Sequence, residues 1–200
     1  MRATLLLLTA TLLSTHASGC GSAQSRPEDA LAALPPPSLL PADALGRDIF
    51  LRQRVVAEWP SGETQFEAIV QKEDDRLQVF GLSPAGQVGF IFTLEGGEVH
   101  VENRAGRTLP FSPAWILADV QRAYYPSEAL QGGELELIET LAEDGLPARR
   151  VFQRAGERVI VIEYGPAEGR AIAPEKVRLE NLEYDYRLLI ETFEETFLDG

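Results

Sequence analysis

From residue 47 onward, apolar and polar residues alternate along most of the chain. In residues 49–59 one face of this alternation is apolar and the other is charged, with Ile49, Leu51, Val55, Ala57 and Trp59 opposite Arg52, Arg54 and Glu58. The alternation continues through residues 66–71, 77–79, 88–94 and 99–101, and the turn sequences PSG, KEDD, SPAG and EGG separate these stretches. A period of two indicates half-buried strands, so this half of the chain predicts an antiparallel meander of five strands.

The period changes once, after residue 111. Ser112 and Pro113 are typical of a helix N-cap and first turn, and Pro126 ends the run. Between them, apolar residues recur at helical spacing: Ile116, Leu117, Val120, Ala123 and Tyr124. The stretch predicts one amphipathic helix of about three turns.

Alternation then returns in ELELIE, ARRVFQR, ERVIVIEY, KVRLENLEY and YRLLIETF. We therefore predict a mainly β (α+β) fold, in which about ten antiparallel strands carry an inserted helix. One helix cannot cover so wide a sheet, so the sheet must curve and enclose its own apolar face. Curved sheets and barrels of this size can hold one small apolar ligand.

The start of the chain has the organisation of an export signal. Arg2 precedes the apolar residues 5–13, and the small residues 17–19 stand immediately before Cys20, the single cysteine of the protein. Such a site resembles the bacterial lipobox, at which the signal is cut off and the cysteine is acylated, although Ala17 stands where Leu is usual. We expect residues 1–19 to be a lipoprotein signal peptide and Cys20 a membrane anchor; a plain secreted protein is the alternative. Two or more acyl chains anchor stably, because each buried methylene contributes about 0.8 kcal/mol.

Residues 20–46 are rich in Ala and Pro and include the triplet at 35–37, so we interpret them as a tether between the lipidated cysteine and a domain at 47–200. The second half of this stretch has an equal alternative, in which Leu39, Leu40 and Leu45 dock on the domain as an irregular strand. The net charge of −13 and the lack of a Lys/Arg cluster exclude nucleic acid as a partner.

Several motifs together resemble a known family. They are the lipobox-like start, WPSG at 59–62, GLSPAGQVGFIFTLEGG at 81–97, PAWILADVQRAYYP at 113–126 and LENLEYDYRLLIETF at 179–193. The combination, over most of residues 35–195, is similar to an uncharacterised family of bacterial outer-membrane lipoproteins. That family resembles the LolA/LolB lipoprotein carriers, and some of its members belong to aryl polyene gene clusters.

The resemblance implies a half-open LolB-like barrel with a helix as lid over an apolar cavity for acyl chains of lipoproteins or lipids. It also implies an outer-membrane protein facing the periplasm, in line with Gly21 rather than Asp after the cysteine, and a periplasmic LolA-like carrier as partner. Candidate cavity residues are Phe66, Phe90, Phe92, Ile116, Val120, Tyr184 and Tyr186. The alternative for each aromatic residue is ordinary core packing.

In LolB-type proteins, the loop between the third and fourth strands presents a large apolar residue to the membrane. Leu82, Pro84 and Ala85 are the corresponding candidates. Ala85 buries far less apolar area than Leu or Phe, which weakens insertion by about 1 to 2 kcal/mol. Leu82 compensates only if it also points outward.

Other function classes find less support in the residues. His100 is placed as a solvated residue on a strand, and GLSPAG departs from the nucleophile elbow because its second glycine is one residue late. With no metal-ligand spacing and no phosphate-cradling glycines, we expect a protein that is not an enzyme and needs no metal or cofactor. The remaining alternative is an assembly lipoprotein with a filled barrel, which binds no lipid and recruits a protein partner through its acidic surface and its strand edge.

Overall fold

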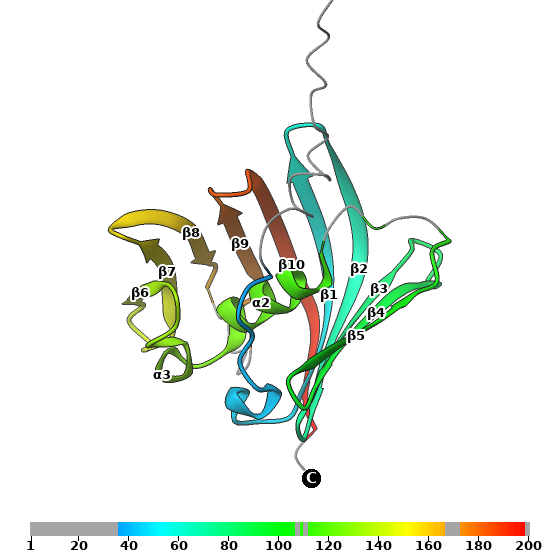
Figure 1. The fold of residues 1–200 in the computed structure, drawn as a ribbon, viewed down its shortest axis with the longest axis horizontal. Helices are drawn as coiled ribbons and strands as arrows, with labels where there is room; N and C mark the ends of the chain where they lie inside the picture. Colours follow the sequence, from blue (N-terminus) through cyan, green and yellow to red (C-terminus); the bar gives the residue numbers. More distant parts are fainter. Residues whose placement is uncertain (1–35, 107–108, 110–111, 167–172, 199–200) are drawn as a thin grey trace, which may run out of the picture.

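The computed structural model describes residues 36–106, 109, 112–166 and 173–198, and the fold is drawn in Figure 1. In this part of the chain, ten strands form one antiparallel sheet with the order β5-β4-β3-β2-β1-β10-β9-β8-β7-β6. The first and last strands, β1 (Ile49–Trp59) and β10 (Tyr186–Phe197), pair with each other at the centre. The sheet is strongly curved and does not close, which confirms the predicted half-open barrel (Figure 1).

Each wing of the sheet is a run of hairpins. One wing consists of β2 (Gly62–Glu73), β3 (Arg76–Leu82), β4 (Val88–Glu95) and β5 (Glu98–Asn103). The other consists of β6 (Glu136–Leu141), β7 (Pro147–Arg154), β8 (Glu157–Tyr164) and β9 (Lys176–Asn181). The period-two stretches of the sequence therefore correspond to strands, because each strand has one buried face.

Strand β9 is shorter than the sequence predicts. The alternation in KVRLENLEY extends to residue 184, but the strand ends at Asn181. The Asn181 Oδ1 atom accepts hydrogen bonds from the backbone N–H groups of Glu183 (3.2 Å) and Tyr184 (3.0 Å), and this local bonding turns the chain toward β10.

Helix α2 (Pro113–Tyr124) lies across the concave side of the sheet (Figure 1). Its N-cap is Ser112 and Pro113 occupies the first turn, as predicted, although the Ser112 side chain makes no capping hydrogen bond. A second short helix, α3 (Ser127–Leu130), follows Pro126 and was not predicted. Buried side chains from Ala42 to Leu188 form one core cluster between the helix and both wings.

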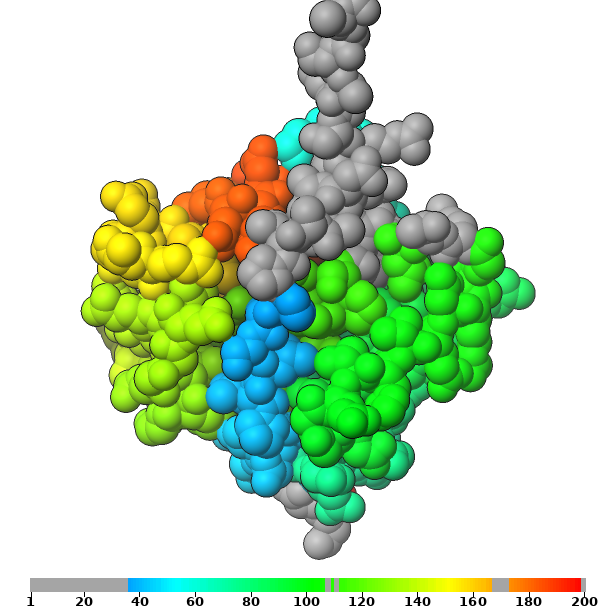
Figure 2. Space-filling view, viewed as in Figure 1, coloured from blue at the N-terminus to red at the C-terminus, as the bar shows by residue number. Residues whose placement is uncertain are grey.

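The segment before β1 docks on the domain, which is one of the two alternatives for the second half of the tether. It forms no strand but the 3-10 turn η1 (Ala42–Leu45), in which Ala42 and Leu45 are buried. Leu39 and Leu40 pack against the core. Figure 2 shows this segment, in blue, crossing the open side of the molecule between the two wings.

Candidate functional site

A cavity of about 120 Å³ lies between α2 and the inner face of the sheet. The central strands and β2 supply much of its wall, and the helix supplies the opposite side. Most of the lining is apolar, and includes Val55, Ala57, Ala68, Leu188, Ile190 and Ala123. The mainly apolar wall suits a hydrocarbon chain better than a polar metabolite.

Strand β1 shows how the cavity is oriented. Its inward residues line the cavity from Gln53 to Trp59, a span of about 20 Å at the usual rise of a strand. Beyond Gln53, Leu51 is fully buried and lies outside the lining. At the other end the lining includes Pro60, which is exposed. The cavity therefore ends in the protein near Gln53 and reaches the surface near Pro60.

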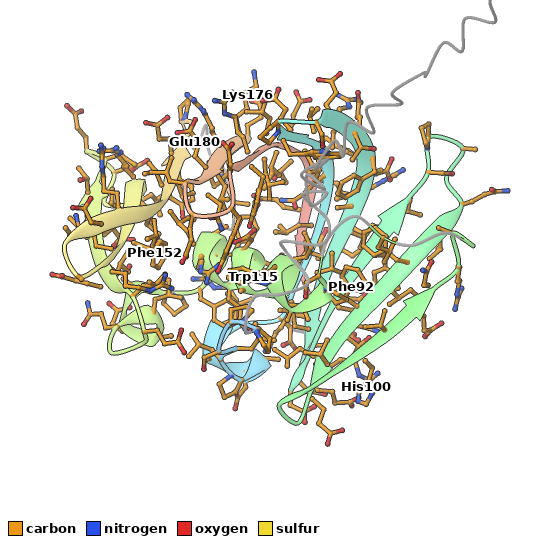
Figure 3. The ribbon with its side chains drawn as sticks, turned by 45° about the horizontal axis from the view of Figure 1, so that its top comes forward. Phe92, His100, Trp115, Phe152, Lys176 and Glu180 are labelled. Carbon is orange, nitrogen blue, oxygen red and sulfur yellow. The ribbon has the colours of Figure 1, made fainter. Side chains whose placement is uncertain are left out.

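Five of the seven predicted cavity residues line this space: Phe66, Ile116, Val120, Tyr184 and Tyr186. Phe66 projects from β2, the two aliphatic residues from α2, and the tyrosines from the β9–β10 turn and the start of β10. The ring of Tyr184 meets Trp115 of α2 edge-on at 4.2 Å between centroids. Trp115, labelled in Figure 3, is a lining residue that the sequence did not single out.

Phe90 and Phe92 do not line the cavity. Phe92 is fully buried in the core, and its ring stacks on Phe90 with centroids 4.5 Å apart. The Phe90 ring in turn meets Phe66 edge-on at 6.0 Å. It also lies over Gly81, where an added Cβ would fall 2.0 Å from Cε1 of Phe90. The cavity occupies only part of the apolar face of the sheet, and these two rings lie outside that part. They pack behind Phe66, which does line the cavity.

The turn between β3 and β4 carries the predicted membrane-facing residues. Pro84 and Ala85 are exposed at its tip, whereas Leu82 is only 9% exposed. Leu82 therefore does not add apolar surface to the tip.

A buried carboxyl group links the helix to the sheet. Asp119 of α2 is 4% exposed, and its carboxylate accepts hydrogen bonds from the Tyr186 hydroxyl and from Nη1 of Arg122 at 3.0 Å. Asn181 donates to the same Tyr186 hydroxyl at 3.2 Å. Burial raises the pKa of Asp119, against the opposing effect of Arg122 and Tyr186. Burial and then the nearby Asp119 raise the pKa of Tyr186.

A second polar cluster lies at the inner end of the cavity. Gln53 is 2% exposed, and its Nε2 donates to the Tyr124 hydroxyl at 2.7 Å and to Oγ1 of Thr192 at 2.9 Å. Burial raises the pKa of Tyr124 to about 12, so this hydroxyl is neutral at physiological pH. Both Gln53 and Asp119 stand at positions that the periodicity assigns to apolar faces. A single polar residue on an otherwise apolar face is the sequence feature that could have identified both as site residues.

The C-terminal half of α2 is held by further polar contacts. The Arg150 guanidinium is buried and donates to the backbone carbonyls of Arg122 (2.9 Å) and Ala123 (3.4 Å) and to Glu139 (2.7 Å). The Tyr164 hydroxyl donates to the Ala123 carbonyl at 2.9 Å. These donors satisfy carbonyls that the end of a helix leaves unpaired.

The docked N-terminal segment holds the outer side of the same helix. The Leu40 N–H donates to Oε1 of Gln121 at 2.9 Å, and Nε2 of Gln121 donates back to the Leu40 carbonyl at 2.7 Å. The Tyr125 hydroxyl donates to the Ala42 carbonyl at 3.2 Å. Three hydrogen bonds thus join residues 40–42 to α2 and to its C-cap residue, Tyr125.

The other candidate chemistry lies apart from the cavity. His100 stands on β5 at the outer edge of the sheet, with its side chain 61% exposed and 3.9 Å from Glu98 (Figure 3). Among the described residues, no group of three or more His, Cys, Asp or Glu side chains is placed to hold a metal ion. In the same residues, no helix has the length and apolar character needed to cross a membrane. The predicted anchor, Cys20, lies outside the described residues.

Solved structures with a similar fold have very different sequences. A DUF1329 family protein from Desulfovibrio piger superposes with a TM-score of 0.51 at 12% identity, over 80% of this chain and 90% of that one. A LolA superfamily protein from Nitrosomonas europaea has a TM-score of 0.48 at 9% identity, over 80% of this chain and 95% of that one. A structure named as an outer membrane lipoprotein-sorting protein domain, from Vibrio parahaemolyticus, has a TM-score of 0.46 at 8% identity, over 77% of this chain and 86% of that one.

A search of curated proteins finds no match to this chain. Residues 50–194 match one protein family, and this range runs from β1 to β10 and includes α2. The match includes every residue that lines the cavity and nearly all of the sheet, and it covers well over half of the sequence. The chain therefore belongs to the family described as protein of unknown function (DUF3261).

Proposed function

We propose that this protein binds an acyl chain of a lipid or lipoprotein in the cavity beneath α2. On this proposal it holds or hands over its cargo at the periplasmic face of the outer membrane, to which acylated Cys20 anchors it. The observation that carries the proposal is the apolar cavity itself, closed near Gln53 and reaching the surface near Pro60. The role is binding rather than catalysis, and a LolA-like periplasmic carrier is the expected donor of cargo.

The size of the cavity indicates that binding requires movement. Pockets for small ligands usually enclose about 300 to 1,000 Å³. The cavity of about 120 Å³ is smaller, so in this conformation it takes only a short stretch of a chain. A longer stretch fits if α2 moves away from the sheet.

The contacts of α2 suggest which end moves. Its C-terminal half is tied down by Arg150, Tyr164 and the Gln53–Tyr124 hydrogen bond. Its first turn contacts the β9–β10 turn through the Trp115–Tyr184 ring pair, and its middle contacts β10 through the hydrogen bond between Asp119 and Tyr186. We therefore expect the helix to open at its N-terminal end, near Pro60, with its C-terminal end as the hinge.

Native mass spectrometry tests the proposed cargo. The chain from residue 20 onward, with Cys20→Ser to prevent acylation, is exported behind a cleavable signal peptide from a secreted protein, purified without detergent and weighed. We expect a retained mass in the range of a fatty acid, a phospholipid or a polyene lipid. A bare protein that also refuses added acyl probes would instead favour the assembly lipoprotein that recruits a protein partner.

Labelling with radioactive palmitate tests the anchor separately. The unsubstituted chain is expected to incorporate the label and to fractionate with the outer membrane. The Cys20→Ser chain is expected to do neither. Equal labelling of both chains would rule out Cys20 as the acylated residue without affecting the proposed cavity.

A further inference from the structure

The amide of Gln53 is the polar group at the closed end of the cavity. Gln53 lines the cavity, yet its neighbours on the inward face of β1, Leu51 and Val55, are aliphatic. A buried amide carries two N–H donors and a carbonyl acceptor, and each needs a partner. An apolar side chain would pack here without that requirement.

Only one end of this amide is satisfied by described residues. Nε2 donates to Tyr124 and Thr192, whereas Oε1 accepts no hydrogen bond from the part of the chain that the structure describes. Within that part, the one side-chain nitrogen or oxygen atom that is shut off from solvent and has no hydrogen-bond partner is Nε of Arg149. Oε1 is therefore not sealed by protein, and the open space beside Gln53 is the cavity.

We propose that Gln53 selects ligands in which the apolar chain carries a hydroxyl group. This inference rests on the proposed function and names the substrate class of the same site. A plain hydrocarbon chain that filled the inner end would shut Oε1 off from solvent and offer it no hydrogen bond. A buried polar group left unpaired in this way disfavours binding. A hydroxyl group on the chain donates a hydrogen bond that Oε1 accepts, while both N–H groups of Nε2 keep their bonds to Tyr124 and Thr192.

The position of Gln53 also sets where the hydroxyl group lies on the ligand. The polar part of an acyl ligand stays near Pro60, where the cavity reaches the surface, and the chain extends toward Gln53. The recognised hydroxyl is therefore on the chain itself, away from the carboxyl or ester end. The Tyr124 and Thr192 hydroxyls hold the amide in place for this contact.

Competition between matched fatty acids tests the inference. The chain from Cys20 onward with Cys20→Ser is mixed with equal amounts of ω-hydroxyhexadecanoic and hexadecanoic acid, or of ricinoleic and oleic acid. Each pair differs in one hydroxyl group, and native mass spectrometry separates the two complexes by mass. We expect the hydroxylated member of at least one pair to be preferred by at least about fivefold.

Two variants assign the preference to Gln53. Gln53→Met keeps a side chain of similar length without the amide, and we expect the preference to disappear or reverse. Gln65→Met makes the same change at an exposed position of β2 and should keep the preference of the unsubstituted chain. Circular dichroism checks that each variant is folded, and if Gln53→Met does not fold, the comparison of the two pairs on the unsubstituted chain decides.

The outcomes separate the inference from the function beneath it. Equal binding of both members of both pairs would overturn the hydroxyl preference and leave acyl-chain binding intact. A preference that survives in Gln53→Met would overturn the assignment to this residue. Failure of all four acids to bind would contradict the proposed function, and the inference with it.

Discussion

The Tyr186 hydroxyl on β10 donates a hydrogen bond to the Asp119 carboxylate on α2, 67 positions away in the sequence. Both residues line the cavity, and both are held by further partners, Asn181 on the sheet side and Arg122 on the helix. The contact joins a central strand to the middle of the helix. Its strength therefore bears on both the stability of the fold and the opening of the cavity.

Tyr186→Phe should destabilise the domain by about 1 to 3 kcal/mol. The substitution keeps the ring but leaves buried Asp119 and Asn181 each without one hydrogen-bond partner. The free energy of unfolding, measured in urea, checks the value. Tyr184→Phe keeps the ring contact with Trp115 and should change stability by less than about 0.5 kcal/mol. Equal losses in both variants would argue against a special role for the Asp119 contact.

The pH dependence of stability should report the buried Asp119 carboxyl. Its folded-state pKa is raised above 3.8, so the folded protein holds this proton more tightly than the unfolded chain. The resulting stabilisation is complete below the unfolded pKa and is lost as the pH rises through the folded pKa. The melting temperature of Asp119→Asn should therefore rise relative to that of the unsubstituted protein as the pH increases above about 4. A constant difference across that window would contradict the assignment.

Arg150→Met should cost about 3 to 5 kcal/mol of stability. The change leaves Glu139 and two helix carbonyls without their buried guanidinium partner. Arg149→Met is the matched control, since that side chain is 42% exposed and its Nε lies 3.9 Å from Glu163, too far for a hydrogen bond. We expect the control to cost less than about 1 kcal/mol. Chemical denaturation of both variants gives the comparison.

Ala68→Phe should reduce uptake of a fluorescent fatty acid at least about tenfold, which corresponds to about 1.4 kcal/mol of binding free energy. Ala68 is buried on the cavity wall, and the larger ring would occupy the space beneath α2. Ala105→Phe places the same ring at an exposed position and should bind normally. Undiminished uptake in folded Ala68→Phe would show that the ligand binds elsewhere.

Gly81→Ala should destabilise the wing of β3 and β4 by about 1 to 3 kcal/mol. The added methyl group would overlap the Phe90 ring, which supports Phe66 at the cavity wall. At Gly89, on the next strand, an added Cβ meets its nearest atoms at ordinary distances of 3.6 and 3.8 Å. Gly89→Ala should therefore stay within about 0.5 kcal/mol of the unsubstituted protein in thermal or urea unfolding.

The periodicity of the sequence predicts the strands and α2 because each has one buried face, and burial selects apolar residues at the corresponding spacing. It overextends β9, where the side chain of Asn181 turns the chain. It also omits η1 and α3, which are each only 4 residues long. Elements of that length are too short for a period to register.

The site is less accessible to sequence reasoning than the fold. Phe66 and Phe92 both lie on apolar strand faces, yet only Phe66 lines the cavity. The difference depends on where the curved sheet leaves space beneath α2, and the sequence does not show this. The contacts of Gln53 with Thr192 and of Asp119 with Tyr186 join residues 139 and 67 positions apart. A pattern with a period of two or 3.6 carries no information about such pairs.

The route of residues 36–46 has a mechanical consequence. Leu40 is hydrogen-bonded to Gln121 of α2, and Ala42 to the C-cap residue Tyr125, before the chain enters β1. Tension on the N-terminal end therefore loads these bonds first and acts on α2 before it reaches the sheet. The distance between the start of the chain and the domain can therefore change the position of α2 over the cavity.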